Sequence, residues 1–518
     1  MKILLSYISG APGRDDPYIS LLPTGLCSLH ACLREAGFDA SLANFSGWKD
    51  EAVIRQLETL KPDIVAISQW THNRHASMEL ARLVRRVAPG CIVVMGGGHA
   101  TFRYQEILRQ GSPVDIVALG EAEATLVELA GRRGEGRGWS DIRGIAFSRA
   151  GEVVVNPPRP PLADLDRLPF PSSSLEHSIG VDLDRQLEFI LTARGCPSAC
   201  RFCSSPGFWD RRVRFRSPEN IVAEILCIRD RHGLIYFSLR DDTFTADRSR
   251  TIAFCRLLIE RRANILWNCQ SRVNALDEEL LVWMKRAGCE CVQLGVESGS
   301  PRILAMLGKA ITPLQVEQAA AQIRKVGINL SVYLISDVPG ETEADIAQTM
   351  ELIRRIRTDD GYVSPLAYYP GTRLFEEAVA AGRVSRGIFE ESREAALYAA
   401  GKPGRNSRRL LRALAGHAPR DAGRFQRQKE LLGYCHATNV LAGEWHRQRG
   451  DTKAAEREYR EITVEQPDNP WGWYLLGELY DELGEGKTAT QCYRTVLGIV
   501  PEHGPSRSAL AAKKEAGP

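Results

Sequence analysis

The sequence predicts an α/β protein with an all-α C-terminal part, and three patterns support this prediction. Residues 1 to about 135 alternate strand and helix patterns, which is typical of a doubly wound parallel sheet. From about residue 186 a strand–loop–helix pattern occurs six times, which indicates a partial (β/α)6 barrel. Near the end of the chain, equivalent residues recur at a constant spacing, which indicates helical repeats.

These patterns divide the 518 residues into five segments. We expect the doubly wound domain at 1–140 and a hairpin with a proline-rich connector at 141–185. The hairpin is expected to turn at 149–151, and the prolines that follow make the connector stiff. The barrel is expected at 186–380, a basic helical segment at 381–436 and the helical repeats at 437–510.

The composition is that of an ordinary soluble protein, with 25% charged residues, 44% hydrophobic residues and a net charge of +3. No apolar run approaches the length of a membrane span, and the first residues predict a short strand rather than a signal peptide. Thirteen cysteines without a secretion signal favour a reducing compartment, so we expect a cytoplasmic location. Their odd number also argues against a disulfide framework.

The doubly wound domain is predicted from four apolar strands at 3–8, 63–68, 91–96 and 114–120, with helices at 25–36, 50–60 and 76–87. Such a sheet binds its ligand at the carboxyl ends of its strands, where glycines let the backbone approach a bulky ligand. A run of glycines is equally consistent with a tight turn. The residues at these strand ends are Ser68, Gln69, Trp70, Gly97, Gly98, His99, Gly120 and Glu121.

The barrel is predicted from strands at 187–192, 235–240, 265–270, 291–296, 329–336 and 362–369, with helices at 217–232, 247–262, 277–287, 313–325 and 342–357. Catalytic groups in barrels lie where strands end. Four polar residues stand at these ends, although a carboxylate there is equally able to cap the next helix. They are Asp241, Asp242, Arg272 and Glu297.

Three cysteines follow the first strand of the predicted barrel in Cys-x-x-x-Cys-x-x-Cys spacing: Cys196, Cys200 and Cys203. Thiolates are soft ligands that suit iron–sulfur clusters, and three ligands leave one iron of a four-iron cluster open. A zinc site needs a fourth ligand at close spacing, and the next candidates, Cys227 and His232, fall in a helical pattern. The alternative is that these three are ordinary buried structural cysteines, which are common in proteins. We favour the metal-binding, catalytic interpretation.

This cysteine motif, with Gly195 before it and Phe202 within it, resembles the radical S-adenosylmethionine (SAM) superfamily. The resemblance extends from the start of the chain to about residue 380. It implies a 4Fe–4S cluster on the three cysteines, which binds SAM at the open iron and cleaves it reductively. An electron donor of the flavodoxin or ferredoxin type is implied as a partner.

The N-terminal domain resembles the cobalamin-binding domain that is fused to many radical SAM enzymes. The matching positions are Thr24 and Gly25, then Gly97 to His99, then Gly120 and Glu121. The Asp-x-His-x-x-Gly motif of other cobalamin proteins is absent. The resemblance therefore implies cobalamin without a histidine from that motif, with Gln69 and Trp70 nearest its lower face. Trp70 is equally interpreted as a core aromatic residue.

The same resemblance implies the contacts to SAM. Asp241 and Glu297 would accept hydrogen bonds and Arg272 would supply a positive charge, with Phe202 beside the cluster. For Asp241, helix capping remains an equal alternative. Asp337 stands where the family usually has glycine, which departs from the pattern.

The resemblance implies C-methylation of an unactivated carbon through a 5′-deoxyadenosyl radical and methylcobalamin. Rearrangement or cyclisation with the same cofactors is an alternative. A binding or assembly protein with a relic barrel is a second alternative, and the intact cysteine motif weighs against it. The substrate is expected to be a small molecule or carrier-bound, and the sequence does not identify it.

The C-terminal part carries two further patterns. Residues 383–429 are rich in arginine, which indicates a solvated helix face or a site for an anionic ligand, whereas no aromatic interleaving supports nucleic acid. Gly450 and Tyr459 recur as Gly484 and Tyr493, and this constant offset is the tetratricopeptide period. Two repeats are few for an independent fold, so we expect them to pack against the rest of the chain and to dock a partner protein.

Overall fold

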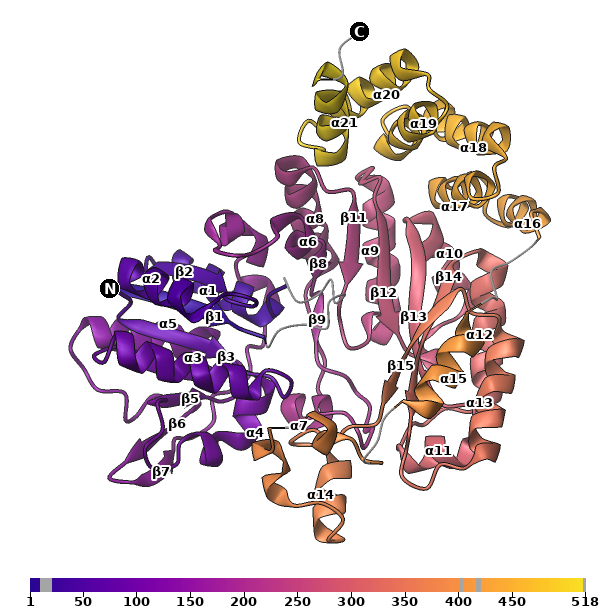
Figure 1. Ribbon diagram of the computed structural model, residues 1–518. Helices are drawn as coiled ribbons and strands as arrows, with labels where there is room; N and C mark the ends of the chain where they lie inside the picture. The colour runs from indigo at the N-terminus through magenta and orange to yellow at the C-terminus, as the bar shows by residue number, and fades with distance from the viewer. Residues whose placement is uncertain (10–20, 393, 401–403, 416–420, 516–518) are drawn as a thin grey trace. The chain divides into compact units, whose positions relative to one another are not determined.

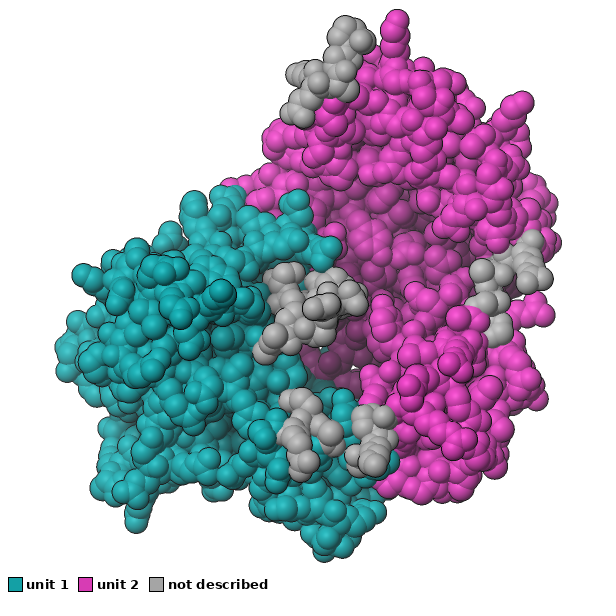
Figure 2. All heavy atoms as spheres, in the orientation of Figure 1, with its two compact units in different colours: residues 1–186, 198–215, 367–402 teal, residues 187–197, 216–366, 403–518 magenta. Residues whose placement is uncertain are grey.

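The structure is a computed structural model (Figure 1), which describes residues 1–9, 21–392, 394–400, 404–415 and 421–515. The chain forms two compact units (Figure 2). Unit 1 comprises residues 1–186, 198–215 and 367–402, and unit 2 comprises residues 187–197, 216–366 and 403–518. The loop that carries the three cysteines passes from unit 2 into unit 1.

Unit 1 contains a seven-stranded sheet in the order β2-β1-β3-β4-β5-β6-β7. The pairs from β2 to β5 are parallel, whereas β6 and β7 are antiparallel to their neighbours. The strands are β1 (Lys2–Tyr7), β2 (Asp39–Asn44), β3 (Ile64–Ser68), β4 (Ile92–Gly96), β5 (Ile116–Ala118), β6 (Ile145–Arg149) and β7 (Glu152–Val155).

The four predicted strands and the hairpin of unit 1 are confirmed, with two differences. β5 is shorter than the expected 114–120, and β2 falls outside the prediction. β2 contains Asp39, Ser41 and Asn44 between Ala40, Leu42 and Ala43, so it shows no continuous apolar run. Its backbone pairs with β1, which makes it the edge of the sheet.

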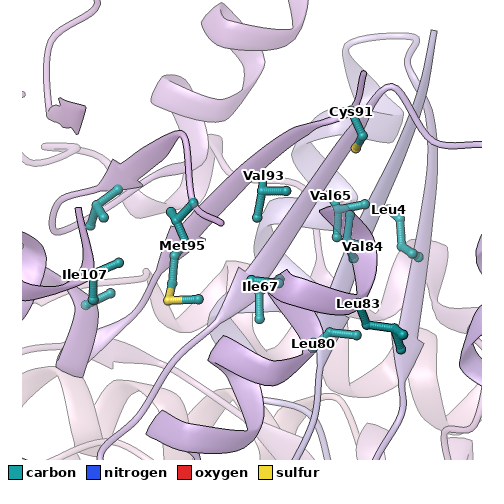
Figure 3. Close-up of a cluster of buried hydrophobic side chains, with 14 of the residues drawn as sticks. Leu4, Val65, Ile67, Leu80, Leu83, Val84, Cys91, Val93, Met95 and Ile107 are labelled. Atoms are coloured by element: carbon teal, nitrogen blue, oxygen red, sulfur yellow. The ribbon is translucent and has the colours of Figure 1, made fainter. Parts of the chain in front are cut away.

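Five helices accompany this sheet, and α1 packs against α5 while α2 packs against α3. Figure 3 shows part of the core, a cluster of buried side chains that includes Leu4, Ile67 and Met95 of the strands and Leu80 of α3. The prediction did not include α4 or α5. The helices are α1 (Thr24–Glu35), α2 (Asp50–Leu60), α3 (Arg74–Val87), α4 (Gly98–Ile107) and α5 (Glu123–Gly134).

Unit 2 contains a six-stranded parallel sheet in the order β15-β14-β13-β12-β11-β8. All six predicted strands are present, although β8 is shorter than expected because α6 (Leu183–Leu187) precedes it, and β15 ends earlier. The strands are β8 (Phe189–Ile190), β11 (Tyr236–Leu239), β12 (Leu266–Ser271), β13 (Cys289–Glu297), β14 (Asn329–Ser336) and β15 (Asp360–Pro365).

The helices between these strands agree with the prediction because their start signals are strong. A Ser, Asp or Thr precedes each one, and its side chain accepts a hydrogen bond from a backbone N–H of the first turn. The helices are α8 (Pro218–His232), α9 (Arg248–Glu260), α10 (Glu278–Arg286), α12 (Pro313–Val326) and α13 (Glu343–Ile356).

Alternation along the strands of unit 2 produces one apolar face and one polar face. The apolar face includes Leu239, Trp267 and Val332, all fully or almost fully buried. Trp267 packs edge-on against Phe244 and Phe254, which come from the segment that includes α9. This face therefore carries the helical layer.

The C-terminal part is helical, and its helix bounds recur at the offset that separates Gly450 from Gly484. This offset relates both ends of α18 to those of α20, and the start of α19 to that of α21. None of the helices formed by the described residues has the length and apolar character that crossing a membrane requires. The helices are α15 (Arg405–Leu414), α16 (Gly423–Leu432), α17 (His436–Arg447), α18 (Thr452–Glu465), α19 (Pro470–Glu482), α20 (Gly486–Ile499) and α21 (Gly504–Glu515).

The C-terminal helices pack against the amino ends of the strands of unit 2. Leu266 of β12 belongs to the same hydrophobic cluster as Ala437 and Val440 of α17. The ring of His436 is hydrogen-bonded through Nε2 to the carbonyl of Ile265 at 3.1 Å. The expectation that these helices pack against the rest of the chain is therefore confirmed.

Candidate cofactor sites

The three cysteines of the motif lie between β9 (Ala193–Arg194) and α7 (Ser205–Trp209). Cys200 is buried, and Cys196 and Cys203 are half-buried. Three soft thiols on one short loop form a donor set that fits a 4Fe–4S cluster with one open iron. Within the part of the chain that the structure describes, no three His, Cys, Asp or Glu side chains are gathered closely enough to hold a metal ion. Phe202 is half-buried within the same loop.

Asp241 fixes the backbone that leads into the cysteine loop. Its side chain is 1% exposed and accepts hydrogen bonds from the backbone N–H groups of Thr192 at 2.6 Å and Ala193 at 3.0 Å. The hydroxyl of Thr192 donates to the same carboxylate. Burial raises the pKa of Asp241, and Arg250 and these donors oppose the rise. The alternative of helix capping is therefore wrong for Asp241, and the carboxylate is occupied by the strand end.

Two arginines hold the same strand end from the other side. Arg250 donates to the carbonyl of Thr192 at 2.7 Å and to its hydroxyl at 2.6 Å. Arg216 donates to the carbonyl of Leu191 at 2.9 Å and to Glu224 at 2.6 Å. The sequence analysis missed both arginines because they lie outside any motif and far along the chain from the backbone that they contact. With Asp241 they form the network that positions the residues just before Cys196.

Glu297 ends β13 in a left-handed conformation, with φ at 65°. Its carboxylate forms a buried ion pair with Lys309 at 2.8 Å, and the side chains of Lys309 and Glu297 are 6% and 9% exposed. A Cβ atom on Gly295 would lie 2.7 Å from Glu297 Oε1, so this glycine makes room for the pair. The sequence analysis did not single out Lys309, because nothing in its local sequence indicates this ion pair. The carboxylate of Glu297 is therefore buried, and its charge is balanced by Lys309.

Arg272 and Asp337 follow two other strands of the same sheet. Arg272 is half-buried directly after β12. Asp337 follows β14 with φ at 57°, a conformation that favours glycine and tolerates aspartate. Ser336 and Ser407 donate to its carboxylate at 2.9 and 3.2 Å, which anchors the aspartate in this conformation. Its N–H donates to Glu341, a carboxyl whose pKa burial raises to about 7.

Trp70 lies at the carboxyl end of the sheet in unit 1. Its side chain is 43% exposed, which decides against a core aromatic residue. A Cβ atom on Gly98 would lie 3.2 Å from the indole, and one on Gly97 would lie 2.6 Å from the carbonyl oxygen of Gln69. The glycine run is therefore required for the close approach of two strand ends, and α4 begins within it. An exposed flat indole beside glycine is the surface that a bulky planar ligand requires.

The other residues of unit 1 that were expected to contact cobalamin are not all exposed as Trp70 is. Gln69 is 1% exposed and donates to the carbonyl of Arg74 and the hydroxyl of Ser77, so its side chain packs within the domain. Ser68 is buried at the end of β3, and Thr24 and Gly25 form the partly exposed first turn of α1. Of the two residues expected nearest the lower face of cobalamin, Trp70 presents a surface and Gln69 does not.

The histidines near these strand ends are occupied by the protein. His99 is buried, and its Nδ1 is hydrogen-bonded to the hydroxyl of Thr71 at 3.1 Å. Burial, with Arg103 and Arg74 nearby, lowers the pKa of His99 to about 3. His72 Nε2 is hydrogen-bonded to the hydroxyl of Tyr7 at 2.7 Å.

Gly120 and Glu121 follow β5. Gly120 has φ at 70°, and its N–H donates to the hydroxyl of Thr101 at 3.1 Å. The carboxylate of Glu121 accepts two hydrogen bonds from Arg214 at 2.7 and 2.9 Å and one from the N–H of Leu162 at 3.0 Å. Glu121 therefore fastens the connector within unit 1.

Two segments of the chain match known domain families. Residues 19–130 match the B12-binding domain, and residues 190–353 match the radical SAM superfamily. The uncharacterized methyltransferase PH0819 of Pyrococcus horikoshii is 33% identical over 390 residues, which are 73% of this chain and 83% of that protein. The chain belongs to the radical SAM superfamily. It is a radical SAM enzyme with a B12-binding domain.

Two further proteins are similar to this chain. The anaerobic magnesium-protoporphyrin IX monomethyl ester cyclase of Rubrivivax gelatinosus is 31% identical over 336 residues, which are 63% of this chain and 60% of that protein. The solved radical SAM methyltransferase TsrM of Kitasatospora setae, with cobalamin and a [4Fe–4S] cluster bound, shares the fold. Its TM-score is 0.63 at 18% identity, over 73% of this chain and 75% of that one. The cofactors of this radical SAM enzyme are a 4Fe–4S cluster, SAM and cobalamin.

Proposed function

We propose that this radical SAM enzyme is a C-methyltransferase that acts on an unactivated carbon. The observation that carries the proposal is the combination of a three-cysteine loop at a strand end with a B12-binding domain in one chain. The 33% identity to a protein named as a methyltransferase supports it. When bound, the cluster and SAM supply a hydrogen-abstracting radical and cobalamin supplies the methyl group.

The cysteine loop and the strand ends of unit 2 would hold and surround the cluster and SAM. Cys196, Cys200 and Cys203 would ligate the cluster, and the Asp241–Arg250 network would fix the backbone before them. Arg272 and Glu297 would contact SAM, with Lys309 balancing the charge of Glu297. In unit 1, cobalamin would lie on the exposed face of Trp70 and the backbone of the glycines. These groups bind and orient; the cofactors supply the reactivity.

The finer architecture belongs to the same proposal. The six-stranded parallel sheet of unit 2 would be a partial (β/α)6 barrel with its polar face inward. The helix pairs from α17 to α21 would be tetratricopeptide repeats, since the helix bounds recur at the period of that repeat. They would serve recognition of a partner protein or a carrier-bound substrate. An electron donor of the flavodoxin or ferredoxin type would reduce the cluster.

Cyclisation is the second candidate, and the 31% identity to a protein named as a cyclase favours it. The two reactions differ in whether a methyl group reaches the product. The test supplies reconstituted full-length enzyme with SAM that carries a trideuterated methyl group, a reductant and a fraction of cell extract that stimulates SAM consumption. Methylation predicts a product that contains the trideuterated methyl group. An unlabelled product, formed together with 5′-deoxyadenosine, would favour cyclisation.

A further inference from the structure

The polar face of the sheet in unit 2 is built from residues in register. In parallel strands, aligned residues point to the same face. Gln270 of β12 aligns with Gln293 of β13, and Gln293 aligns with Ser331 of β14. Tyr333 of β14 aligns with Tyr362 of β15, one step nearer the carboxyl ends. We name these five residues the polar row.

The interior of a β/α barrel is usually filled with branched aliphatic side chains in layers. Hydrogen-bonding groups replace them in the polar row. Below it, nearer the amino ends of the strands, Ser238 donates to Asn268 at 2.8 Å and Asn268 donates to the hydroxyl of Tyr236 at 2.7 Å. Tyr236 in turn donates to Glu290 at 2.8 Å. The polar groups of this lower layer are hydrogen-bonded to one another, so the layer offers no unpaired group to a ligand.

The polar row leaves polar groups unsatisfied. Tyr333 donates to Gln293 Oε1 at 2.8 Å, and Gln270 Nε2 lies at a long 3.5 Å from the hydroxyl of Tyr333. The remaining carboxamide atoms, Gln293 Nε2 and Gln270 Oε1, form no hydrogen bond with the described residues. The hydroxyl of Ser331 is buried, the residue is 1% exposed, and no described group partners it. A buried polar group without a partner costs about 1–3 kcal/mol, so a ligand with matching groups gains binding energy here.

The polar row also offers a flat surface next to the reactive end of the sheet. Tyr362 stacks on Tyr333 with ring centroids 5.3 Å apart and an angle of 19° between the rings. Tyr362 is nevertheless 46% exposed. Arg272 follows Gln270 by two positions, so the row lies on the amino side of the proposed SAM contacts.

We propose that the polar row binds the substrate, and that the substrate is a water-soluble molecule. It would present hydroxyl or amide groups to Gln270, Gln293 and Ser331 and a flat ring to Tyr362. An apolar lipid or polycycle would leave these groups buried and unpaired, which a site built for hydrogen bonding rejects strongly. This inference rests on the proposed function, which places the chemistry at this end of the sheet.

The test uses the reconstituted full-length enzyme and an extract of the source organism partitioned between water and chloroform. Each phase is assayed for stimulation of SAM consumption, read as 5′-deoxyadenosine plus S-adenosylhomocysteine. Stimulation by the aqueous phase is the expected result. Stimulation by the chloroform phase alone, or by neither phase, would overturn the proposal.

Two variants place the effect in the polar row. Gln293→Leu and Ser331→Ala should raise the amount of aqueous extract needed for half-maximal stimulation by at least about tenfold, because each loses a hydrogen bond to the substrate. The control is Gln318→Leu, the same change at an exposed position of α12. Iron content and melting temperature show whether each variant is folded. An unchanged half-maximal amount in both folded variants would overturn the proposal.

The two proposals fail separately. If the aqueous phase stimulates SAM consumption but no labelled methyl group reaches a product, the methylation proposal falls and the substrate class stands. If methylation occurs with a chloroform-soluble substrate, the substrate class falls alone.

Discussion

The carboxylate of Asp241 accepts a hydrogen bond from the backbone N–H of Thr192 at 2.6 Å, four positions before the first cysteine of the motif. Asp241 therefore acts on the cysteine loop through the backbone. Since Asp241 is 1% exposed, no water replaces a donor or acceptor that is lost there.

Asp241→Asn should weaken the cysteine loop. The amide turns an N–H group toward a donor, so a buried hydrogen bond is lost and the free energy of unfolding falls by about 1–3 kcal/mol. We also expect a lower iron content after anaerobic reconstitution. The measurements are the melting temperature and iron per chain. Asp242→Asn, the same change at the exposed neighbour, is the control. Equal values for the two variants would refute the positioning role.

Lys309→Met should leave Glu297 as an unpaired buried carboxylate. Breaking a buried ion pair typically costs about 3–5 kcal/mol, so a clear fall in the melting temperature is expected. Lys325→Met is a matched control, because Lys325 pairs with Glu278 at 2.6 Å while both side chains are about half exposed. That change should cost less than about 1 kcal/mol. Affinity for SAM should fall in Lys309→Met alone; similar thermal stabilities in the two variants would argue against a buried pair.

Cobalt should carry no nitrogen ligand from His72 or His99, because neither histidine stands in an Asp-x-His-x-x-Gly motif and the ring of His99 is buried. Electron paramagnetic resonance of the cobalt(II) form of the bound cobalamin measures this directly. The spectrum should be the same in His72→Ala, His99→Ala and the parent. Nitrogen splitting that disappears in either variant would contradict the expectation.

Trp70→Ala should lower the cobalamin content, because it removes the exposed indole beside Gly98.

The contact between the C-terminal helices and the rest of unit 2 is testable at one glycine. Gly233 has φ at 74°, and a Cβ atom there would lie 2.1 Å from the carbonyl oxygen of Glu502. Gly484 has φ at 77° and no atom within 4 Å of such a Cβ. Both Gly→Ala changes cost about 1 kcal/mol because alanine is strained in the left-handed conformation. Any further loss of stability in Gly233→Ala is therefore due to the contact with Glu502. Equal melting temperatures for the two variants would show that the contact is absent in solution.

The pH dependence of this contact follows from His436. Burial lowers the pKa of His436 to about 4, below its ordinary value of 6.5. The folded state therefore binds fewer protons than the unfolded state between these values. The stability that the buried, neutral His436 contributes is therefore fully present above about pH 6.5 and is lost progressively as the pH falls toward 4.

Most of the fold was predictable because it depends on local patterns. Apolar runs placed most strands of both sheets, and Ser, Asp or Thr residues placed the starts of the five helices between the strands of unit 2. β2 was not predictable in this way, because polar residues interrupt its apolar ones and its position depends on pairing with β1. α4 was hidden because it begins within a glycine run.

The candidate site was predictable only where residues are close in the sequence. The cysteine motif is local, so its spacing was visible. The bond between Thr192 and Asp241 joins residues that are distant in the chain, and the polar row depends on the register of four strands. No sequence pattern reports which way a side chain turns, which is why Gln69 and Glu121 were expected to face a ligand and instead bond within unit 1.

The ratio of the two products of SAM tests the central claim most directly. Each C-methylation consumes two SAM molecules, one giving 5′-deoxyadenosine and one giving S-adenosylhomocysteine, so a ratio of about one to one is predicted with stimulating substrate present. The Cys196→Ala, Cys200→Ala, Cys203→Ala triple variant should form no 5′-deoxyadenosine, whereas Cys227→Ala, a half-buried cysteine in α8, should match the parent. Formation of 5′-deoxyadenosine without S-adenosylhomocysteine, or in the triple variant, would contradict the account.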